Sequence, residues 1–129
     1  MSSFLAPIRR GNAAGLVMRN QRTSAIVATR LLPAFDSETR RRGLLGRESL
    51  DLDSAMLIAP SNAIHTCFMR FSIDVAFVTR DGRVLKIATH LKPWRIAASW
   101  RGYAVVEMAA GSFERVGAAE GDVLSIEPA

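Results

Sequence analysis

The sequence predicts a single α+β domain built on a mostly antiparallel β sheet or a partly closed barrel. At 129 residues, with 49% hydrophobic and 22% charged residues, the chain has the size and composition of one ordinary globular domain. About eight short runs rich in apolar and β-branched residues are separated by turn residues, and only two segments favour short helices. Because the runs do not alternate regularly with helices, we expect mainly antiparallel pairing.

The chain is expected to start with a flexible or loosely docked lead-in, residues 1–12, before a single domain over residues 13–129. Residues 15–19 and 24–32 resemble two strands joined by a polar turn, and Pro33 is expected to end the second. The pair predicts an antiparallel hairpin.

A short helix is expected to begin after Asp36. Aspartate is a favoured N-cap, and Glu38 places negative charge near the positive end of the helix. Arg40, Arg41 and Arg42 are spaced by about 100° around the helix, so we expect them to point in different directions rather than form one basic face. A glycine directly after them marks the expected end of the helix.

Turn residues delimit the later elements. Residues 55–59 are expected to form a short buried strand that ends at Pro60. Residues 64–78 are the most apolar long run, and we interpret them as two strands of the central sheet with a bend between them. The Asp81-Gly82 turn predicts a hairpin with residues 83–91. Beyond it we expect an irregular loop over 92–102, a strand over 103–108, one or two helical turns between 111 and 117, and a closing strand over 122–127.

Composition also limits the class of protein. No apolar run reaches about 18 residues without a charge, so no membrane span is expected. The first residues lack the pattern of a secretory signal, and a cytoplasmic location is the expectation. The single cysteine permits no internal disulfide. No cofactor is expected, because the sequence contains no glycine-rich phosphate loop, nucleophile elbow or histidine-glutamate zinc motif.

The positive charge is concentrated in the N-terminal third. Residues 1–47 hold nine arginines and two acids, a balance of +7, whereas residues 48–129 hold eight bases and ten acids, a balance of −2. Such a surface could face nucleic acid or lipid head groups. Because aromatic residues are not interleaved with these bases, we expect a solvated surface and no specific binding of nucleic acid.

Two carboxylates interrupt apolar strands and are the first candidates for a polar centre. Asp74 and Glu107 each lie between hydrophobic residues, where an unpaired charge would be costly. Arg70 is the nearest cation to Asp74 in sequence, and Arg40 and Arg47 could reach it from the helix region. Asp74 could tie the sheet to a loop, or it could act as a general base or orient a ligand. If the two carboxylates lie close together, they could form one shared centre.

His65 and Cys67 are two residues apart, a spacing that places both on one face of a strand. Such a pair could chelate a soft metal or combine a thiolate with a base. Two ligands do not complete a site, and a lone buried cysteine is most often a core residue. We therefore expect neither a metal site nor a cysteine nucleophile.

Several short pieces occur together in a fixed order: RRRGLLGR from Arg40, HTCFMRFSID from His65, DGRV from Asp81, Glu107 with Gly111, and Gly121-Asp122. In this combination the chain resembles a widespread prokaryotic family known as domain of unknown function 192, which usually has proline where Ser72 stands. The resemblance implies a small, β-rich α+β domain and supplies no reaction or cofactor. It also points to the motif residues as the place to look for a pocket: Arg40, Arg47, His65, Met69, Arg70, Asp74 and Glu107.

The sequence favours a binding or accessory module that is not an enzyme. Its Arg/His/Asp polar centre would accept a small polar or anionic ligand or a partner peptide, because arginines bind carboxylates and phosphates through paired hydrogen bonds. The alternative is a small hydrolase or metal-assisted enzyme that uses His65 with Asp74, Glu107 or Cys67. No nucleophile, base and oxyanion-stabilising motif is recognisable together, which favours the first hypothesis. A third hypothesis makes the whole motif structural and places function on the basic N-terminal surface.

Overall fold

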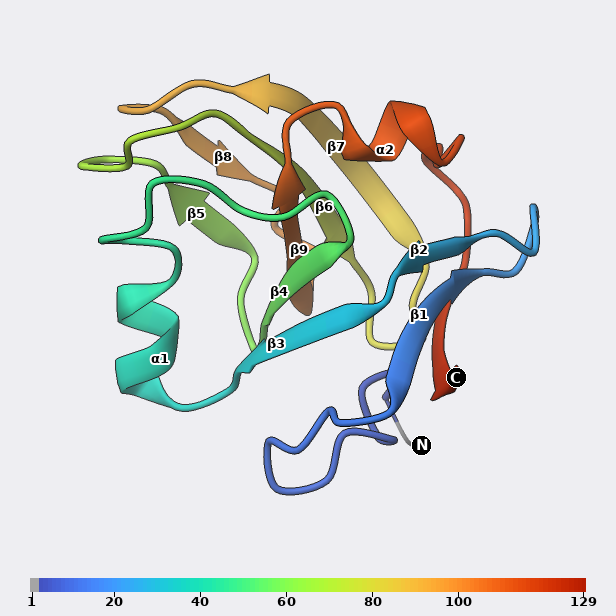
Figure 1. The fold of residues 1–129 in the computed structure, drawn as a ribbon. Helices are drawn as coiled ribbons and strands as arrows, with labels where there is room; N and C mark the ends of the chain where they lie inside the picture. Colours follow the sequence, from blue (N-terminus) through green and yellow to red (C-terminus); the bar gives the residue numbers. More distant parts are fainter. Residues whose placement is uncertain (1–2) are drawn as a thin grey trace.

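The computed structural model describes residues 3–129, which form ten strands and two short helices (Figure 1). The elements in chain order are β1 (Leu16–Asn20), β2 (Ile26–Ala28), β3 (Arg30–Ala34), α1 (Ser37–Arg42), β4 (Ser54–Ile58), β5 (Ala63–His65), β6 (Ile73–Val78), β7 (Val84–Leu91), β8 (Ile96–Ala98), β9 (Ala104–Ala109), α2 (Ser112–Arg115) and β10 (Leu124–Pro128). The expected β-rich α+β class is confirmed.

The strands form three sheets, and the described part of the chain contains no closed barrel. The largest sheet has the order β3-β4-β9-β6-β7, in which only β3 and β4 pair in parallel. A three-stranded sheet has the order β10-β1-β2, and a two-stranded sheet pairs β5 with β8. The mostly antiparallel arrangement therefore agrees with the sequence prediction.

The five-stranded sheet has two differently covered faces. We call the closed face the side on which Leu57, Ala76 and Met108 pack against α2 and the three-stranded sheet. We call the open face the side on which Met56 and Val75 pack against the loop after α1 and against β8. Figure 1 shows α2 and β1, β2 and β10 on one side of β4, β9 and β6, with α1, β5 and β8 on the other.

The first hairpin is present but shorter than expected. β1 and β2 pair in antiparallel fashion, and the chain leaves their sheet after Ala28. It then enters the five-stranded sheet as β3, which continues through Pro33 instead of ending there. Proline is tolerated at this position because β3 is an edge strand, so the missing N–H removes no ladder hydrogen bond from the sheet interior.

The prediction of two central-sheet strands over residues 64–78 is half wrong. Only β6 joins the five-stranded sheet, whereas the earlier part of the run forms β5 and then a series of turns. The partner of β5 is β8, which lies in the segment expected to be an irregular loop. Thr66 keeps the chain out of a long strand, because its backbone N–H donates to the carbonyl of Arg95 at 2.8 Å and its own carbonyl accepts from Met69 at 3.1 Å.

Two local predictions hold in atomic detail. The Asp36 carboxylate accepts a hydrogen bond from the backbone N–H of Thr39 at 2.8 Å and so caps α1. At the β6–β7 hairpin, Gly82 has φ +93°, and a Cβ atom there would collide with the carbonyl oxygen of Leu124. Glycine is thus required both by the backbone conformation and by the space.

Part of the expected lead-in packs on the domain. Leu5 and Ile8 are buried within the core of the closed face, and the N–H of Phe4 donates to the carbonyl of Arg80 at 2.8 Å. The first two residues lie outside the described structure, and the domain boundary at residue 13 stays a prediction. Among residues 3–129, no helix combines the length and the apolar character needed to cross a membrane.

Candidate functional site

The two candidate carboxylates lie on adjacent strands but on opposite faces of the sheet. Glu107 of β9 is in register with Met56 and Val75, which belong to the core of the open face. Asp74 of β6 is in register with Met108, which belongs to the core of the closed face. Since residues in register share a face, the shared centre of Asp74 and Glu107 that the sequence suggested does not exist.

Asp74 is fully buried and satisfied by the backbone. One of its carboxylate oxygens accepts from the N–H of His90 at 2.9 Å, and the other accepts from the N–H of Phe113 at 3.1 Å. These hydrogen bonds tie the end of β7 and the start of α2 to the central sheet. The two donors are backbone N–H groups rather than the arginines considered from the sequence, and the geometry is that of a structural carboxylate.

Glu107 has the opposite environment. The residue is only 4% exposed, and among residues 3–129 no hydrogen bond or ion pair is formed by its carboxyl group. Burial raises the pKa of this carboxyl from 4.5 to about 7, because the charged form loses its hydration without gaining a partner. Near neutral pH the group is thus a mixture of carboxylate and carboxylic acid.

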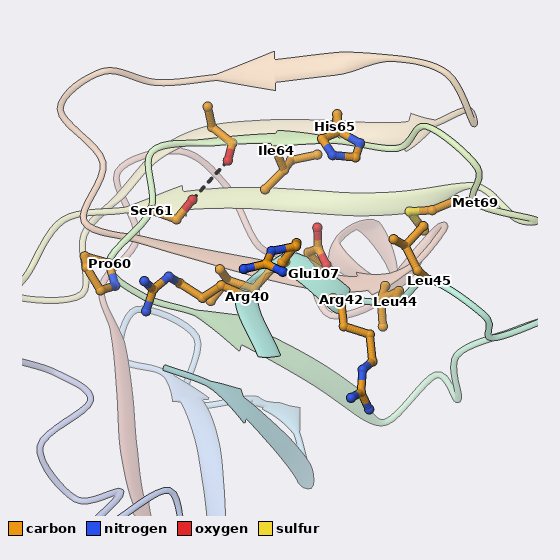
Figure 2. A pocket seen from close by; sticks show the side chains of 14 residues that line it. Arg40, Arg42, Leu44, Leu45, Pro60, Ser61, Ile64, His65, Met69 and Glu107 are labelled. Carbon is orange, nitrogen blue, oxygen red and sulfur yellow. Dashed lines mark hydrogen bonds between the residues drawn. The ribbon is translucent and has the colours of Figure 1, made fainter. Parts of the chain in front are cut away.

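Glu107 faces a pocket of about 280 Å³ on the open face, which we call the arginine-rimmed pocket. Figure 2 shows its carboxyl group among the lining side chains, below Ile64 and His65. The lining comes from the end of α1, the loop that follows it, the end of β4, β5 and β9: Arg40, Arg41, Arg42, Gly43, Leu44, Leu45, Ile58, Pro60, Ser61, Ala63, Ile64, His65, Met69 and Glu107.

The three consecutive arginines border this one pocket, although their side chains diverge. Arg40 Nη1 donates to the carbonyl of Phe35 at 2.6 Å, which fixes its guanidinium beside the helix start. Arg42 pairs with the exposed Glu38 at 3.1 Å and points away from Glu107 in Figure 2. Arg41 has no ion pair within the described residues. Arg40 and Arg42 thus diverge, and the six-residue helix ends at the pocket, so that all three arginines line it.

Two of the motif arginines lie elsewhere. Arg47 lines two other hollows beside Leu32, of about 350 and 530 Å³, on another part of the same loop. Arg70 is exposed and pairs with Glu48 at 3.4 Å. Neither belongs to the arginine-rimmed pocket, and neither is hydrogen-bonded or ion-paired to Asp74.

The side chain of His65 is hydrogen-bonded to the backbone of Cys67. The exposed His65 lines the pocket, and its Nδ1 accepts from the N–H of Cys67 at 3.2 Å. Cys67 lies in the turn after β5, so the common strand face expected for the two residues is absent. In the part of the chain that the structure describes, no three His, Cys, Asp or Glu side chains gather as a set of metal ligands.

Sequence reasoning missed the apolar wall of the pocket. Leu44, Leu45, Ile58 and Ile64 line it beside Met69. The two leucines lie inside the quoted RRRGLLGR piece, so the motif contained the signal, whereas Ile58 is recognisable only once β4 is placed beside β9.

A family model for an uncharacterised group, domain of unknown function 192, matches residues 17–126. No curated protein matches the chain. Two solved structures share the fold: a Novosphingobium aromaticivorans protein of unknown function and a Sinorhizobium meliloti protein proposed as a transcription regulator. Each has a TM-score of 0.74 and 22% identity and matches 85% of this chain, over 82% and 90% of its own length respectively. At this identity the likeness shows the fold alone.

Proposed function

The chain belongs to the family known as domain of unknown function 192, and for this member we propose that the arginine-rimmed pocket binds a small, partly apolar anion without transforming it. The observation that carries the proposal is Glu107, a buried carboxyl without a protein partner at the floor of a pocket with arginines at its rim. The polar centre is thus Arg/His/Glu, with Asp74 outside it.

The floor of the pocket favours a ligand with a hydrogen-bond acceptor. A buried polar group without a partner is unfavourable, and a ligand that supplies the partner relieves this penalty. Because the pKa of Glu107 is about 7, the group can carry a proton at neutral pH and donate it to an oxygen of the ligand. A neutral acid also removes the repulsion that a carboxylate would exert on an anion.

The rim favours negative charge. Arg41 is free of ion pairs within residues 3–129, and Arg40 is held beside the pocket by its hydrogen bond to Phe35. Guanidinium groups bind carboxylate and phosphate through two parallel hydrogen bonds. A cationic ligand would prefer the charged form of Glu107 but would meet these arginines first.

The apolar lining and the volume of the pocket indicate the chemistry and the size of the rest of the ligand. Leucine, isoleucine and methionine side chains cover one side of the cavity, and its volume of about 280 Å³ suits a small organic molecule or one terminal residue of a peptide. Short aliphatic or aromatic carboxylates, small phosphate esters and the C-terminus of a partner peptide all combine an apolar body with an anionic end.

The pH dependence of binding tests this proposal. We would titrate hexanoate and phenyl phosphate into the labelled protein and follow amide chemical shifts at about pH 6 and about pH 8. Since Glu107 is about one-tenth protonated at a pH one unit above its pKa, the affinity for an anion should fall about tenfold across this range. Glu107→Gln should bind with little pH dependence.

Matched arginine variants complete the test. Arg41→Gln should weaken binding at both pH values, whereas Arg47→Gln, which alters an exposed arginine of the same motif outside the pocket, should have no effect. An affinity for these anions that stays constant or rises with pH would contradict the role given to the protonated form of Glu107. The absence of shifts around Glu107 with every anion would refute the proposal.

A second candidate, an acid–base enzyme, is favoured by one observation. Glu107 and His65 line the same pocket, and a carboxyl pKa near 7 suits a general acid or base. Asp74 and Cys67 do not line that pocket, so the enzymatic hypothesis now depends on this pair. Turnover of a panel of activated esters and phosphate esters that drops at least about a hundredfold in Glu107→Gln would support it over simple binding.

A further inference from the structure

Four large hydrophobic side chains stand in solvent around the two-stranded sheet. Phe68, Trp94, Ile96 and Trp100 are 72%, 58%, 78% and 81% exposed. Phe68 follows β5, Trp94 precedes β8, Ile96 lies on β8 and Trp100 follows it. Figure 1 shows the chain after β5 and after β7 as two tips at one edge of the molecule. Phe68 and Trp94 lie at one end of the β5–β8 ladder and Trp100 at the other, with Ile96 between them. We call these four residues the aromatic surface.

The two tips meet through their aromatic rings. The ring centroids of Phe68 and Trp94 are 4.6 Å apart at an interplanar angle of 59°. Both residues have φ +66°, a left-handed conformation that is uncommon for residues other than glycine. Such a conformation is unfavourable and persists only where neighbouring groups enforce it.

A single buried residue enforces it. Thr66 is fully buried, and its carbonyl accepts from Trp94 N–H at 3.0 Å and Met69 N–H at 3.1 Å. Its hydroxyl donates to the carbonyl of Lys92 at 2.6 Å and accepts from the N–H of Arg95 at 2.9 Å. The fold therefore holds Phe68 and Trp94 in an unfavourable backbone conformation, and their apolar rings remain exposed to solvent. Exposed apolar patches of this kind mark interaction sites.

The rest of the aromatic surface follows from the pleat of β8. Ala97 is buried against the open face, so Ile96 beside it points outward. None of the pockets described above includes Phe68, Trp94 or Trp100. The surface therefore presents protruding side chains rather than a groove for a peptide.

The charge around this surface is positive. Residues 82–106 contain five Lys or Arg and no Asp or Glu, and residues 54–73 contain one arginine and no acid. Of the bases nearest the aromatic surface, Lys92, Arg95 and Arg101 form no ion pair within residues 3–129, whereas Arg70 pairs with Glu48.

We propose that the aromatic surface docks on an anionic lipid bilayer. Tryptophan and phenylalanine favour the membrane–water interface, isoleucine favours the acyl region, and lysine and arginine attract anionic head groups. The uncompensated charge of Lys92, Arg95 and Arg101 opposes docking of a second copy of this chain. Bases of a nucleic acid would need free aromatic faces, but Phe68 and Trp94 pack on each other and Ile96 cannot stack. The guanidinium of Arg101 lies over the ring of Trp100, 5.5 Å from its centroid. The proposal does not depend on a ligand in the arginine-rimmed pocket.

Intrinsic fluorescence provides a direct measurement, because the only two tryptophans of the chain, Trp94 and Trp100, both lie on this surface. We would add vesicles of phosphatidylcholine with about a quarter phosphatidylglycerol, and vesicles of phosphatidylcholine alone, to the full chain. The anionic vesicles should shift the emission to shorter wavelength and co-sediment the protein. Neutral vesicles should have a much weaker effect, and salt should reverse the binding.

Variants can remove the rings without disturbing the backbone. Asparagine tolerates positive φ, so Phe68→Asn/Trp94→Asn should stay folded while vesicle partitioning falls at least about tenfold. Ile96→Thr/Trp100→Gln, on ordinary strand and turn backbone, should have a similar effect and serves if the first pair fails to fold. Arg95→Gln and Arg101→Gln should each weaken partitioning about fivefold.

Leu52→Asn is the matched control, since Leu52 is 53% exposed but lies in the loop before β4, outside the aromatic surface. It should leave partitioning unchanged. The proposal fails if anionic vesicles do not bind at low salt, or if both double variants fold and bind like the original chain. It also fails if the same residues bind oligothymidylate or mediate self-association more strongly than they bind vesicles.

Discussion

Asp74 and Glu107 are two buried carboxylates on neighbouring strands, and they differ in what covers them. Asp74 faces the closed face, where the start of α2 and the end of β7 each direct a backbone N–H at it. Glu107 faces the open face, where no group of residues 3–129 pairs with it and a pocket adjoins it. A polar group in a core is structural where the covering elements complete it, and becomes available for function where they do not.

The covering elements explain the difference. The closed face lies under a three-stranded sheet and α2, whose Phe113 is buried in the same core. The open face is covered by α1, which has only six residues and buries none of them, and by loops and the small β5–β8 sheet. Leu44, Leu50 and Met69 of the loops and Ala97 of β8 pack on this face, yet a pocket remains beside Glu107. That pocket is where the open face can admit a ligand.

The largest expected difference is in the free energy of unfolding when a side chain is enlarged near each face. Gly82→Ala should lower the free energy of unfolding by about 4 kcal/mol, because the new methyl group meets the Leu124 carbonyl and the backbone has positive φ. Ala63→Val at the rim of the arginine-rimmed pocket should change the free energy of unfolding by less than about 0.5 kcal/mol. Urea denaturation of both variants measures the contrast, and equal effects would show that the Gly82 turn tolerates added volume as well as the exposed rim of the pocket does.

Loss of charge at Asp74 should be the next largest effect. Asp74→Asn keeps one acceptor but directs an amide NH₂ at a backbone N–H, so it should destabilise the domain by about 3 kcal/mol. Denaturation at neutral pH gives the value. Ligand binding should fall only with the folded fraction. If Asp74→Asn were as stable as the original chain, the carboxylate would not be the structural tie that its two hydrogen bonds indicate.

Replacing Glu107 by its amide, glutamine, should raise the free energy of unfolding instead of lowering it, by an amount that depends on pH. The pKa is about 7 in the folded chain and 4.5 as the ordinary value, so the folded state retains a proton that the unfolded state loses between these pH values. This group's contribution to stability is fully present below about pH 4.5 and is lost as pH rises through about 7, by up to about 3 kcal/mol in total.

Glutamine does not ionise, so Glu107→Gln removes this loss of stability at higher pH. Relative to the original chain, the variant should gain up to about 3 kcal/mol between about pH 4 and about pH 8. Denaturation series at both pH values measure it, with Glu114→Gln as the control, because Glu114 is an exposed residue of α2. A constant difference between variant and original chain would mean that Glu107 titrates normally, and the pocket would then hold a charged carboxylate at neutral pH.

Local chemistry made parts of this fold predictable. The Asp36 cap and the Asp81-Gly82 turn depend on neighbouring residues, and both are where the sequence placed them. The position of Pro33 was misjudged because its tolerance depends on β3 being an edge strand, which only the complete sheet order decides. β5 and β8 have three residues each and owe their place to hydrogen bonds from Thr66, which no local pattern reveals.

Four of the seven candidate residues line one pocket, and the sequence could not show that these four lie together. The family motif included Arg40, His65, Met69 and Glu107, all of which line the pocket. Strand alternation showed that Asp74 and Glu107 interrupt apolar runs, but the face of each depends on the register between β6 and β9, which are distant in sequence. A register set by long-range pairing cannot be derived from either strand alone.

The closed face has one exception to its complete pairing, and it gives the smallest expected effect. The Ser112 hydroxyl at the start of α2 is buried, and within residues 3–129 it has no hydrogen-bond partner. Ser112→Ala removes an unsatisfied polar atom without opening a large cavity, so it should raise the free energy of unfolding by up to about 1 kcal/mol. The hydroxyl of Ser61, beside the arginine-rimmed pocket, donates to the Ala63 carbonyl at 3.0 Å. Ser61→Ala should therefore lower the free energy of unfolding slightly. Thermal and urea denaturation of both variants measure the two signs. A loss of stability in Ser112→Ala would mean that the hydroxyl has a partner such as ordered water, and the closed face would then be fully satisfied.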